Sequence, residues 1–155
     1  MFDEDAPQGR SVEQLRGIEG GKVKAIYRCL ATNAGLKWEG RSHETVLSSP
    51  LNRAISGANA ALYGITEAVI LTLGYSPSIG FVHRGDPRSF VFDVADCLKF
   101  KTVVPLAMRV AKESSEDIEG RIRRGCRDEF FSCGIANQLV TIVNGVIEDG
   151  LAASD

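Results

Sequence analysis

Apolar residues recur along most of this chain at alternating spacings of three and four, the pattern of an amphipathic α-helix. The clearest case begins at Ser49 and Pro50, which suit a helix N-cap and a first helical turn. Its apolar positions are Leu51, Ile55, Ala58, Leu62, Ile65 and Val69. Gly74 suits the end of a helix. The pattern therefore predicts one long helix between Ser49 and Gly74.

A second long helix is predicted to begin at Ser11, with Gln14 as the capping-box partner three positions on. Its apolar positions are Leu15, Ile18, Val23, Ile26, Tyr27 and Leu30. Gly17, Gly20 and Gly21 lie inside it, and each costs a helix about 1 kcal/mol relative to alanine. We therefore expect either a bend in this helix or another group that approaches its backbone closely.

The rest of the chain predicts four more helical segments. A loop rich in Gly and Pro, YSPSIGFVHRGDPR, precedes a helix that Ser89 can cap and that includes FVFDVADCLKF. Pro105 indicates the start of another helix or a kink, and residues 102–112 continue as helix. Two more helical stretches fit 116–132 and 134–150, with Gly134 between them.

No alternating strand pattern persists along the chain, so the predicted fold class is all-α. We expect a compact domain of about six helices at 11–150, a flexible leader at 1–10 and a short tail at 151–155. A length of 155 residues suits one domain with a single core. Hydrophobic residues at 44% and charged residues at 25% are typical of a soluble globular protein.

Charge is spread unevenly along the chain. The formal net charge is -2, which gives no general attraction to nucleic acid, so DNA binding would need a local patch. Residues 81–127 carry ten Lys and Arg against seven Asp and Glu, a net charge of +3. A basic patch is therefore expected in this part of the chain.

The cysteines and the chain start indicate a cytoplasmic protein. Cys29, Cys97, Cys126 and Cys133 lack metal-finger spacing, and we expect reduced thiols. The first residues are acidic, unlike a signal peptide, and no apolar run is expected to be long enough to cross a membrane.

Asp93 and Asp96 carry the strongest chemical signal. They lie three apart on a predicted helix, so they share a face, and the residues around them are apolar on nearly every side. A buried carboxylate is costly unless a cation or a metal ion pairs with it, and two close together repel. Pairing with basic residues and binding of a metal ion therefore remain equal alternatives.

Two further residues are candidate metal ligands. His83 lies in a loop between glycines, GFVHRG, that can bring it over the start of the helix carrying Asp93. Glu19 lies between Gly17 and the pair Gly20 and Gly21. One imidazole nitrogen with carboxylate oxygens suits Mg²⁺ or Mn²⁺ better than zinc.

Four basic residues bracket this proposed site: Arg84, Arg88, Lys99 and Lys101. Such residues beside a metal centre are suited to the phosphate backbone of DNA. Glu67 lies opposite the apolar stripe of its helix, which favours a surface or salt-bridged role. Tyr63, one turn before it, is a weaker candidate for a residue that faces the site. A diiron bundle would need Glu-x-x-His motifs, and none is present.

The chain is similar, in four stretches and in their spacing, to the C-terminal domain of the CRISPR-associated integrase of type I-E systems. The stretches are RSVEQLRGIEG, LYGITEA, GFVHRG and SFVFDVADCLKF. The resemblance runs from about Ser11 to about Asp149. It implies metal ligands at Glu19, His83 and Asp96, with Asp93 as a further functional position.

The resemblance also implies the activity and the partners. The family joins 3′-hydroxyl ends of a short DNA to the CRISPR repeat by metal-dependent transesterification, and also cleaves branched DNA. Its active assembly holds integrase dimers on a small dimeric partner protein, so DNA, that partner and a homo-oligomer are the expected partners. The family's N-terminal β-rich domain is expected to be missing here. The alternative is therefore a truncated, non-catalytic helical module that binds DNA or the small partner.

Overall fold

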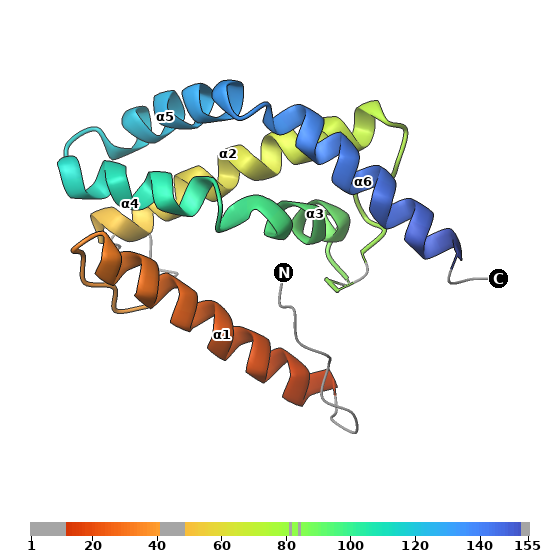
Figure 1. Ribbon diagram of the computed structural model, residues 1–155, viewed down its shortest axis with the longest axis horizontal. Coiled ribbons are helices and arrows are strands. Elements are labelled where there is room, and N and C mark those ends of the chain that lie inside the picture. Colours follow the sequence, from red (N-terminus) through yellow and green to blue (C-terminus); the bar gives the residue numbers. More distant parts are fainter. Residues whose placement is uncertain (1–11, 41–48, 81, 84, 153–155) are drawn as a thin grey trace.

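Six α-helices make up the part of the chain that the structure, a computed structural model, describes (Figure 1). It describes residues 12–40, 49–80, 82–83 and 85–152, and the side chains among residues 20–149 of these ranges. The helices are α1 Val12–Asn33, α2 Pro50–Thr72, α3 Ser89–Lys99, α4 Val103–Glu113, α5 Ile118–Ser132 and α6 Ile135–Ala152. No strand occurs in these ranges, so the predicted all-α fold of about six helices is confirmed.

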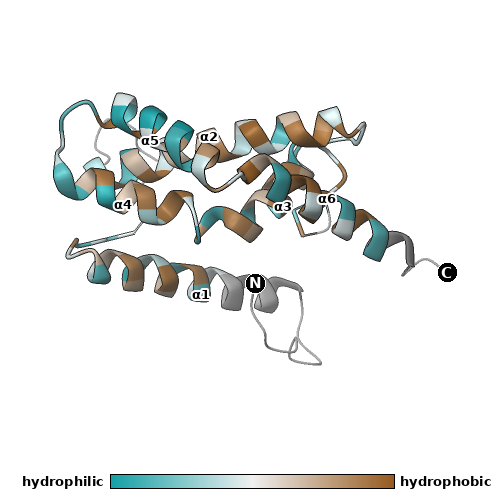
Figure 2. Cartoon of the chain, turned by 45° about the horizontal axis from the view of Figure 1, so that its top comes forward, coloured by the Kyte–Doolittle hydropathy of each residue, from teal (hydrophilic) through white to brown (hydrophobic). Residues whose placement is uncertain are grey.

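Helix α2 forms the centre of the domain, because α3, α4, α5 and α6 all pack against it. The first four positions of the predicted apolar stripe are buried: Leu51, Ile55, Ala58 and Leu62. The last two, Ile65 and Val69, are only half-buried, because the buried face there passes through Thr66 and Ile70. Figure 2 shows the apolar surfaces of the helices turned toward one another. Helix α2 is long and apolar enough to span a membrane, contrary to expectation, but its place in the core explains that composition.

The helix ends follow the sequence signals at most positions. Ser49 caps α2, since its side chain accepts a hydrogen bond from the Asn52 backbone N–H, and Gly74 follows the helix with a φ of +83°. Pro105 lies in the first turn of α4, and Gly134 lies between α5 and α6, which meet at an angle of 70°. These signals therefore placed four boundaries correctly.

Ser89 is an exception to the predicted caps. The N-cap residue of α3 is Arg88, and no side chain caps that helix. Ser89 is instead the first helical residue, and its hydroxyl donates to the carbonyl oxygen of Asp86 at 2.7 Å. The serine therefore closes the turn before α3 and does not cap the helix.

Helix α1 packs against the rest of the domain chiefly through α4. Tyr27 is buried, with its ring stacked on Trp38 at 5.2 Å and edge-on to Phe100 at 5.2 Å. The Trp38 indole N–H donates to the Asn52 side-chain oxygen at 3.3 Å. Trp38 therefore anchors the loop after α1 to Tyr27 and to α2.

The glycine pair in α1 differs from expectation. Gly20 and Gly21 are exposed in one continuous helix, and no neighbouring group lies within 4 Å of where a Cβ atom would stand at either position. The expected close approach to the backbone is therefore not made at these two glycines by any described residue.

We expect Gly21→Ala to raise the free energy of unfolding by about 1 kcal/mol, because alanine has the higher helix propensity and there is room for its methyl group. Urea denaturation followed by circular dichroism measures the change. Gly145→Ala in α6, also with open space around its Cβ position, should give a similar gain. A loss of stability in Gly21→Ala alone would contradict this view of α1.

Candidate active site on α3

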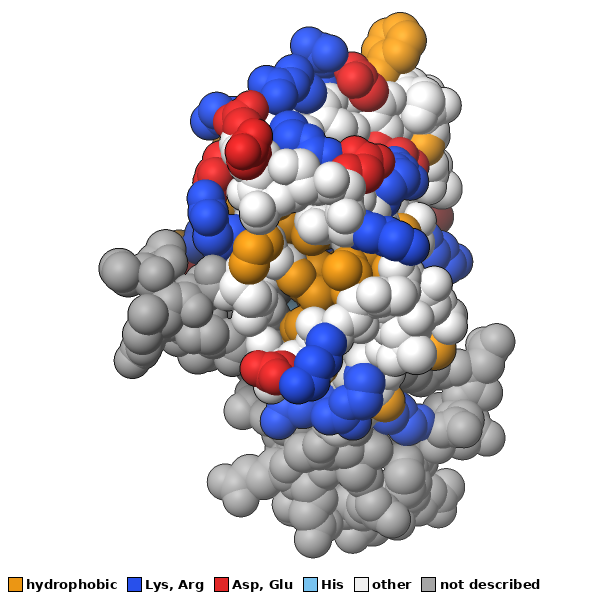
Figure 3. All heavy atoms as spheres, turned by 90° about the vertical axis from the view of Figure 1, so that its left-hand side faces the viewer, with side chains coloured by type: hydrophobic (Ala, Val, Ile, Leu, Met, Phe, Trp, Pro, Cys, Tyr) orange, Lys and Arg blue, Asp and Glu red, His pale blue; other side chains and the backbone are white. Residues whose placement is uncertain are grey.

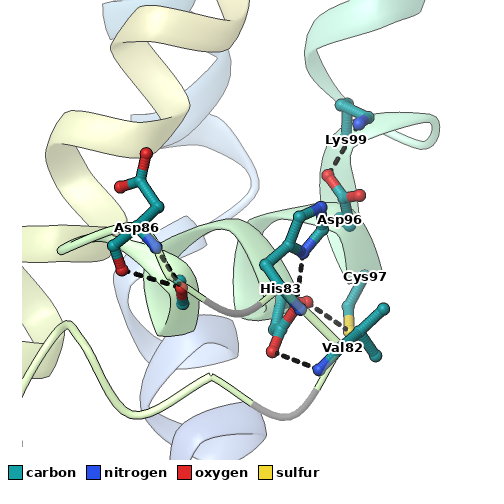
Figure 4. A network of polar contacts seen from close by, with 8 residues as sticks. Val82, His83, Asp86, Asp96, Cys97 and Lys99 are labelled. Atoms are coloured by element: carbon teal, nitrogen blue, oxygen red, sulfur yellow. Dashed lines mark hydrogen bonds and ion pairs between the residues drawn. The ribbon is translucent and has the colours of Figure 1, made fainter.

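The loop before α3 is held over the helix by Asp93. Its carboxylate accepts hydrogen bonds from the backbone N–H groups of Val82 and His83, both at 3.0 Å. It also contacts the His83 ring at Nδ1 at 2.6 Å (Figure 4). The Asp93 side chain is only 10% exposed, whereas that of His83 is 44% exposed. Asp93 is therefore enclosed and fully engaged, and His83 faces outward.

Gly80 explains how the loop can turn so tightly. A Cβ atom at this position would lie 1.9 Å from the carbonyl oxygen of His83 and 2.3 Å from the Cβ atom of Ser89. Neither contact is sterically possible, so only glycine fits here. This glycine allows the loop to bring His83 within hydrogen-bonding distance of Asp93.

The bond to Asp93 determines how the imidazole presents itself. An ionised carboxylate can only accept hydrogen bonds, so Nδ1 carries the proton and Nε2 keeps its lone pair when the ring is neutral. A histidine held by a carboxylate in this way is the usual arrangement at metal sites, where the second nitrogen binds the metal ion. The geometry therefore gives Asp93 an orienting role and makes Nε2 of His83 the candidate ligand atom.

Asp96 lies one helical turn further along α3 and pairs with Lys99. The Lys99 ammonium group lies 2.6 Å from Oδ1 of Asp96, and the side chains are 11% and 24% exposed respectively. Burial alone would lower the pKa of Lys99, but the charge and hydrogen bond of Asp96 outweigh it and the pKa is raised. Oδ1 of Asp96 is therefore engaged by a charged lysine.

Cys97 lies beside this pair, with its thiol 3.5 Å from the carbonyl oxygen of Asp93. Partial burial raises the pKa of the thiol, and the charges of Asp96 and Asp93 add to that rise. Because the thiolate is the form that binds metals, this cysteine is a poor ligand at neutral pH. The donor atoms of the site are thus imidazole nitrogen and carboxylate oxygen, which suit Mg²⁺ or Mn²⁺.

An aromatic cluster around Phe92 lies next to His83. The ring of Phe92 meets the rings of Tyr63 at 5.0 Å and of His83 at 5.7 Å, both edge-on. The Arg88 guanidinium lies over Phe92, 5.2 Å from its centre. Tyr63 of α2 is therefore connected to the loop histidine through one aromatic ring.

The other predicted site residues are placed differently. Helix α1 contains Glu19, but the side chain of Glu19 and all of Arg84 lie outside the described residues. Lys101 is exposed just after α3, whereas Lys99 is buried and bonded to Asp96. In the described part of the chain, no three His, Cys, Asp or Glu side chains are grouped as metal ligands.

The arginine-rich segment of α5 is largely paired with acidic residues. Arg121 pairs with Glu113, Arg124 with Asp117 and Arg127 with Asp128. Figure 3 shows Lys and Arg side chains mixed with Asp and Glu side chains on this side of the molecule. This face is therefore of mixed charge.

Comparison with known proteins gives a family match. The family model described as "CRISPR associated protein Cas1" matches residues 2–130. The chain is 44% identical over 152 residues to "CRISPR-associated endonuclease Cas1" of Geobacter sulfurreducens, and 45% identical over 152 residues to the Escherichia coli protein of that name. Each match covers 96% of this chain and 50% of the relative, so the chain spans about half the length of these relatives.

Solved structures show the same helical fold. The structure titled "Crystal structure of TtCas1-DNA complex" matches with a TM-score of 0.77 and 37% identity, over 92% of this chain and 52% of that chain. "Crystal structure of TtCas1" matches with a TM-score of 0.76 and 38% identity, over 91% and 53% of the two chains. The arrangement of helices around α2 is therefore shared with these proteins.

Proposed function

We propose, because this chain belongs to the CRISPR-associated Cas1 family, that it is the helical catalytic part of a metal-dependent DNA endonuclease and integrase. It would act in spacer acquisition, as the resemblance to type I-E integrases implies. The observation that carries the proposal is the hydrogen bond from His83, in the loop before α3, to Asp93, which leaves Nε2 available. Asp93 lies on the same helix as Asp96. The relatives' name of endonuclease supports the nuclease part of the proposal.

Glu19, His83 and Asp96 are the proposed ligands of Mg²⁺ or Mn²⁺. Their imidazole and carboxylate donors fit such an ion. Lys99 donates to Oδ1 of Asp96, so Oδ2 is the oxygen that we propose as the ligand atom. A bound cation would stabilise negative charge on phosphate oxygens and activate a hydroxyl group or water. Asp93 is a positioning residue in this scheme, since it holds His83 and does not face outward.

DNA is the proposed substrate, and a neighbour solved as a DNA complex supports it. Arg84, Arg88, Lys99 and Lys101 are the proposed phosphate contacts. Arg88 and Lys101 are exposed, whereas Lys99 is buried against Asp96 and would act through it. In integration, the oxygen of a 3′-hydroxyl end would form a new bond to a target phosphorus while the bond to the target's own 3′ oxygen breaks. A small dimeric partner protein and a second integrase copy complete the proposed assembly.

Removal of divalent metal tests this function. We expect EDTA to reduce cleavage of branched DNA and joining of 3′-hydroxyl ends to background, and added Mn²⁺ or Mg²⁺ to restore both. Gel assays with labelled DNA measure the products. Equal cleavage with and without EDTA would contradict a metal-dependent activity.

A non-catalytic module that binds DNA or the small partner is the second candidate. It is favoured by the Lys99–Asp96 pair and by the lack of a three-ligand group among the described side chains. Integration assays on this chain, alone and with the family's β-rich domain supplied in trans, separate the two functions. Partner or DNA binding without product in either assay would favour the module.

A further inference from the structure

The ion pair of Lys99 with Asp96 lies at the end of α3, on a residue of the proposed metal site (Figure 4). The ammonium nitrogen of Lys99 lies 2.6 Å from Oδ1 of Asp96, and the lysine side chain is only 11% exposed. The ammonium group also lies 5.2 Å from the centre of the Phe100 ring, a cation–π contact. Lys99 is therefore held at this one oxygen by a carboxylate and an aromatic ring.

The enclosure of this pair calls for a reason other than stability. The desolvation of two buried charges commonly offsets their attraction, so a buried ion pair is weak evidence for a stabilising role. In the ion pairs of Arg121, Arg124 and Arg127, by contrast, at least one side chain is 60% exposed or more. The enclosed lysine is therefore better explained by what it does to the Asp96 carboxylate.

Lys99 limits the way in which Asp96 can bind a metal ion. A free carboxylate can bind a cation through one oxygen or through both. A cation on Oδ1 of Asp96 would share that oxygen with the ammonium group, and two positive charges on one atom repel each other. Asp96 is thereby restricted to a ligand that offers a single oxygen, Oδ2.

Divalent cations differ in how much this restriction costs them. Ca²⁺ takes about six to eight oxygen ligands and often uses both oxygens of a carboxylate, whereas Mg²⁺ prefers an octahedral set and keeps several waters. We propose that Lys99 is a specificity-determining residue that makes the site favour Mg²⁺ or Mn²⁺ over Ca²⁺ by reserving one oxygen of Asp96. This inference rests on the proposed function, since Asp96 must be a metal ligand.

Competition between metal ions in the absence of DNA tests the role of Lys99. Mg²⁺ or Ca²⁺ is titrated into the Mn²⁺-loaded protein, and electron paramagnetic resonance measures the Mn²⁺ that each releases. Lys99→Met removes the ammonium group and frees Oδ1 of Asp96. We expect the ratio of Ca²⁺ affinity to Mg²⁺ affinity to rise by about fivefold or more, the equivalent of one hydrogen bond. The ratio cancels the gain that both cations obtain from the loss of a nearby positive charge.

Further variants assign the effect to the charge of Lys99. Lys99→Gln also lacks the charge and should raise the ratio as well. Lys99→Arg keeps a positive charge and N–H donors, so it should keep the wild-type ratio even where the affinity for both cations changes. Lys112→Met on α4, at an exposed position, is the matched control and should change neither affinity. Circular dichroism checks that each variant is folded.

The outcomes separate this inference from the proposed function. An unchanged ratio in a folded Lys99→Met or Lys99→Gln variant would overturn the role of Lys99, and it would leave metal-dependent cleavage in place. A ratio that rises as much in Lys99→Arg as in Lys99→Met would also overturn it, because the charge would then have no part in selection. Absence of Mn²⁺ binding by the wild-type protein would overturn the ligand set itself, and with it both the inference and the metal-dependent function.

Discussion

Replacement of Asp96 by Asn or Ala is expected to lower metal-dependent cleavage of branched DNA by more than about 100-fold. A bound cation supplies several kcal/mol of charge stabilisation in the transition state, and each 1.4 kcal/mol corresponds to about tenfold in rate. Either substitution removes the carboxylate that we propose as a ligand. Single-turnover cleavage of labelled DNA at saturating Mn²⁺ measures the loss.

The Asn variant is the cleaner of the two because of Lys99. Ala would leave a buried ammonium group without its carboxylate, which is strongly destabilising, whereas Asn keeps an oxygen for Lys99 to donate to. Asp128→Asn on α5, an exposed carboxylate paired with Arg127, is the matched control and should cleave at the wild-type rate. If Asp96→Asn folds normally by circular dichroism and cleaves like the control, Asp96 is not a ligand.

The helical architecture could be predicted from sequence because each signal is local. The apolar stripe of α2, the cap at Ser49 and the terminating Gly74 depend on residues within one or two helical turns. The periodicity of apolar residues also reports burial, so Ile55 and Leu62 were predicted correctly as core positions. Ser89 shows the limit of such signals, because the competing bond to Asp86 cannot be seen in the helix pattern.

The site could be predicted only in part. Sequence placed Asp93 and Asp96 on one face of a helix but left open whether basic residues or a metal ion would pair with them. The structure gives the two aspartates different partners. Asp93 binds the loop backbone and His83, while Asp96 pairs with Lys99. Lys99 was assigned to DNA because it is basic and close in sequence to the proposed site, and its burial depends on tertiary packing that no local pattern reports.

Residues that line a pocket between α2 and the start of α3 show a second kind of limit. Glu67 was expected on a surface or in a salt bridge; it is half-buried in the wall of this pocket and makes no ion pair with a described residue. Asn59 gave no signal at all, because an unsatisfied oxygen becomes apparent only when its neighbours in space are known. Helix position indicated only that Glu67 lies opposite the main apolar stripe of α2, without showing that Arg88 would lie near it.

We expect Asp93→Asn to lower Mn²⁺ affinity by about 10- to 100-fold, the usual effect of removing the residue that orients a metal-binding histidine. The carboxylate accepts from two backbone N–H groups and contacts the His83 ring, using both oxygens. An amide keeps one oxygen and turns an N–H group toward one of these donors. The loop should therefore loosen, and His83 should lose its fixed ring orientation. Isothermal titration calorimetry measures the affinity.

The effect on His83 can be separated from a general loss of stability. Losing one hydrogen bond of this exposed loop should cost about 0.5–1.5 kcal/mol of unfolding free energy, which denaturation measures on the same samples. Nitrogen chemical shifts of the imidazole report the tautomer, which should change from an Nδ1-protonated ring in the wild type to a mixture in Asp93→Asn. Asp149→Asn, an exposed carboxylate at the end of α6, is the control and should change neither quantity. A stable variant with wild-type Mn²⁺ affinity and an altered tautomer would show that His83 is oriented by Asp93 but does not bind the metal ion.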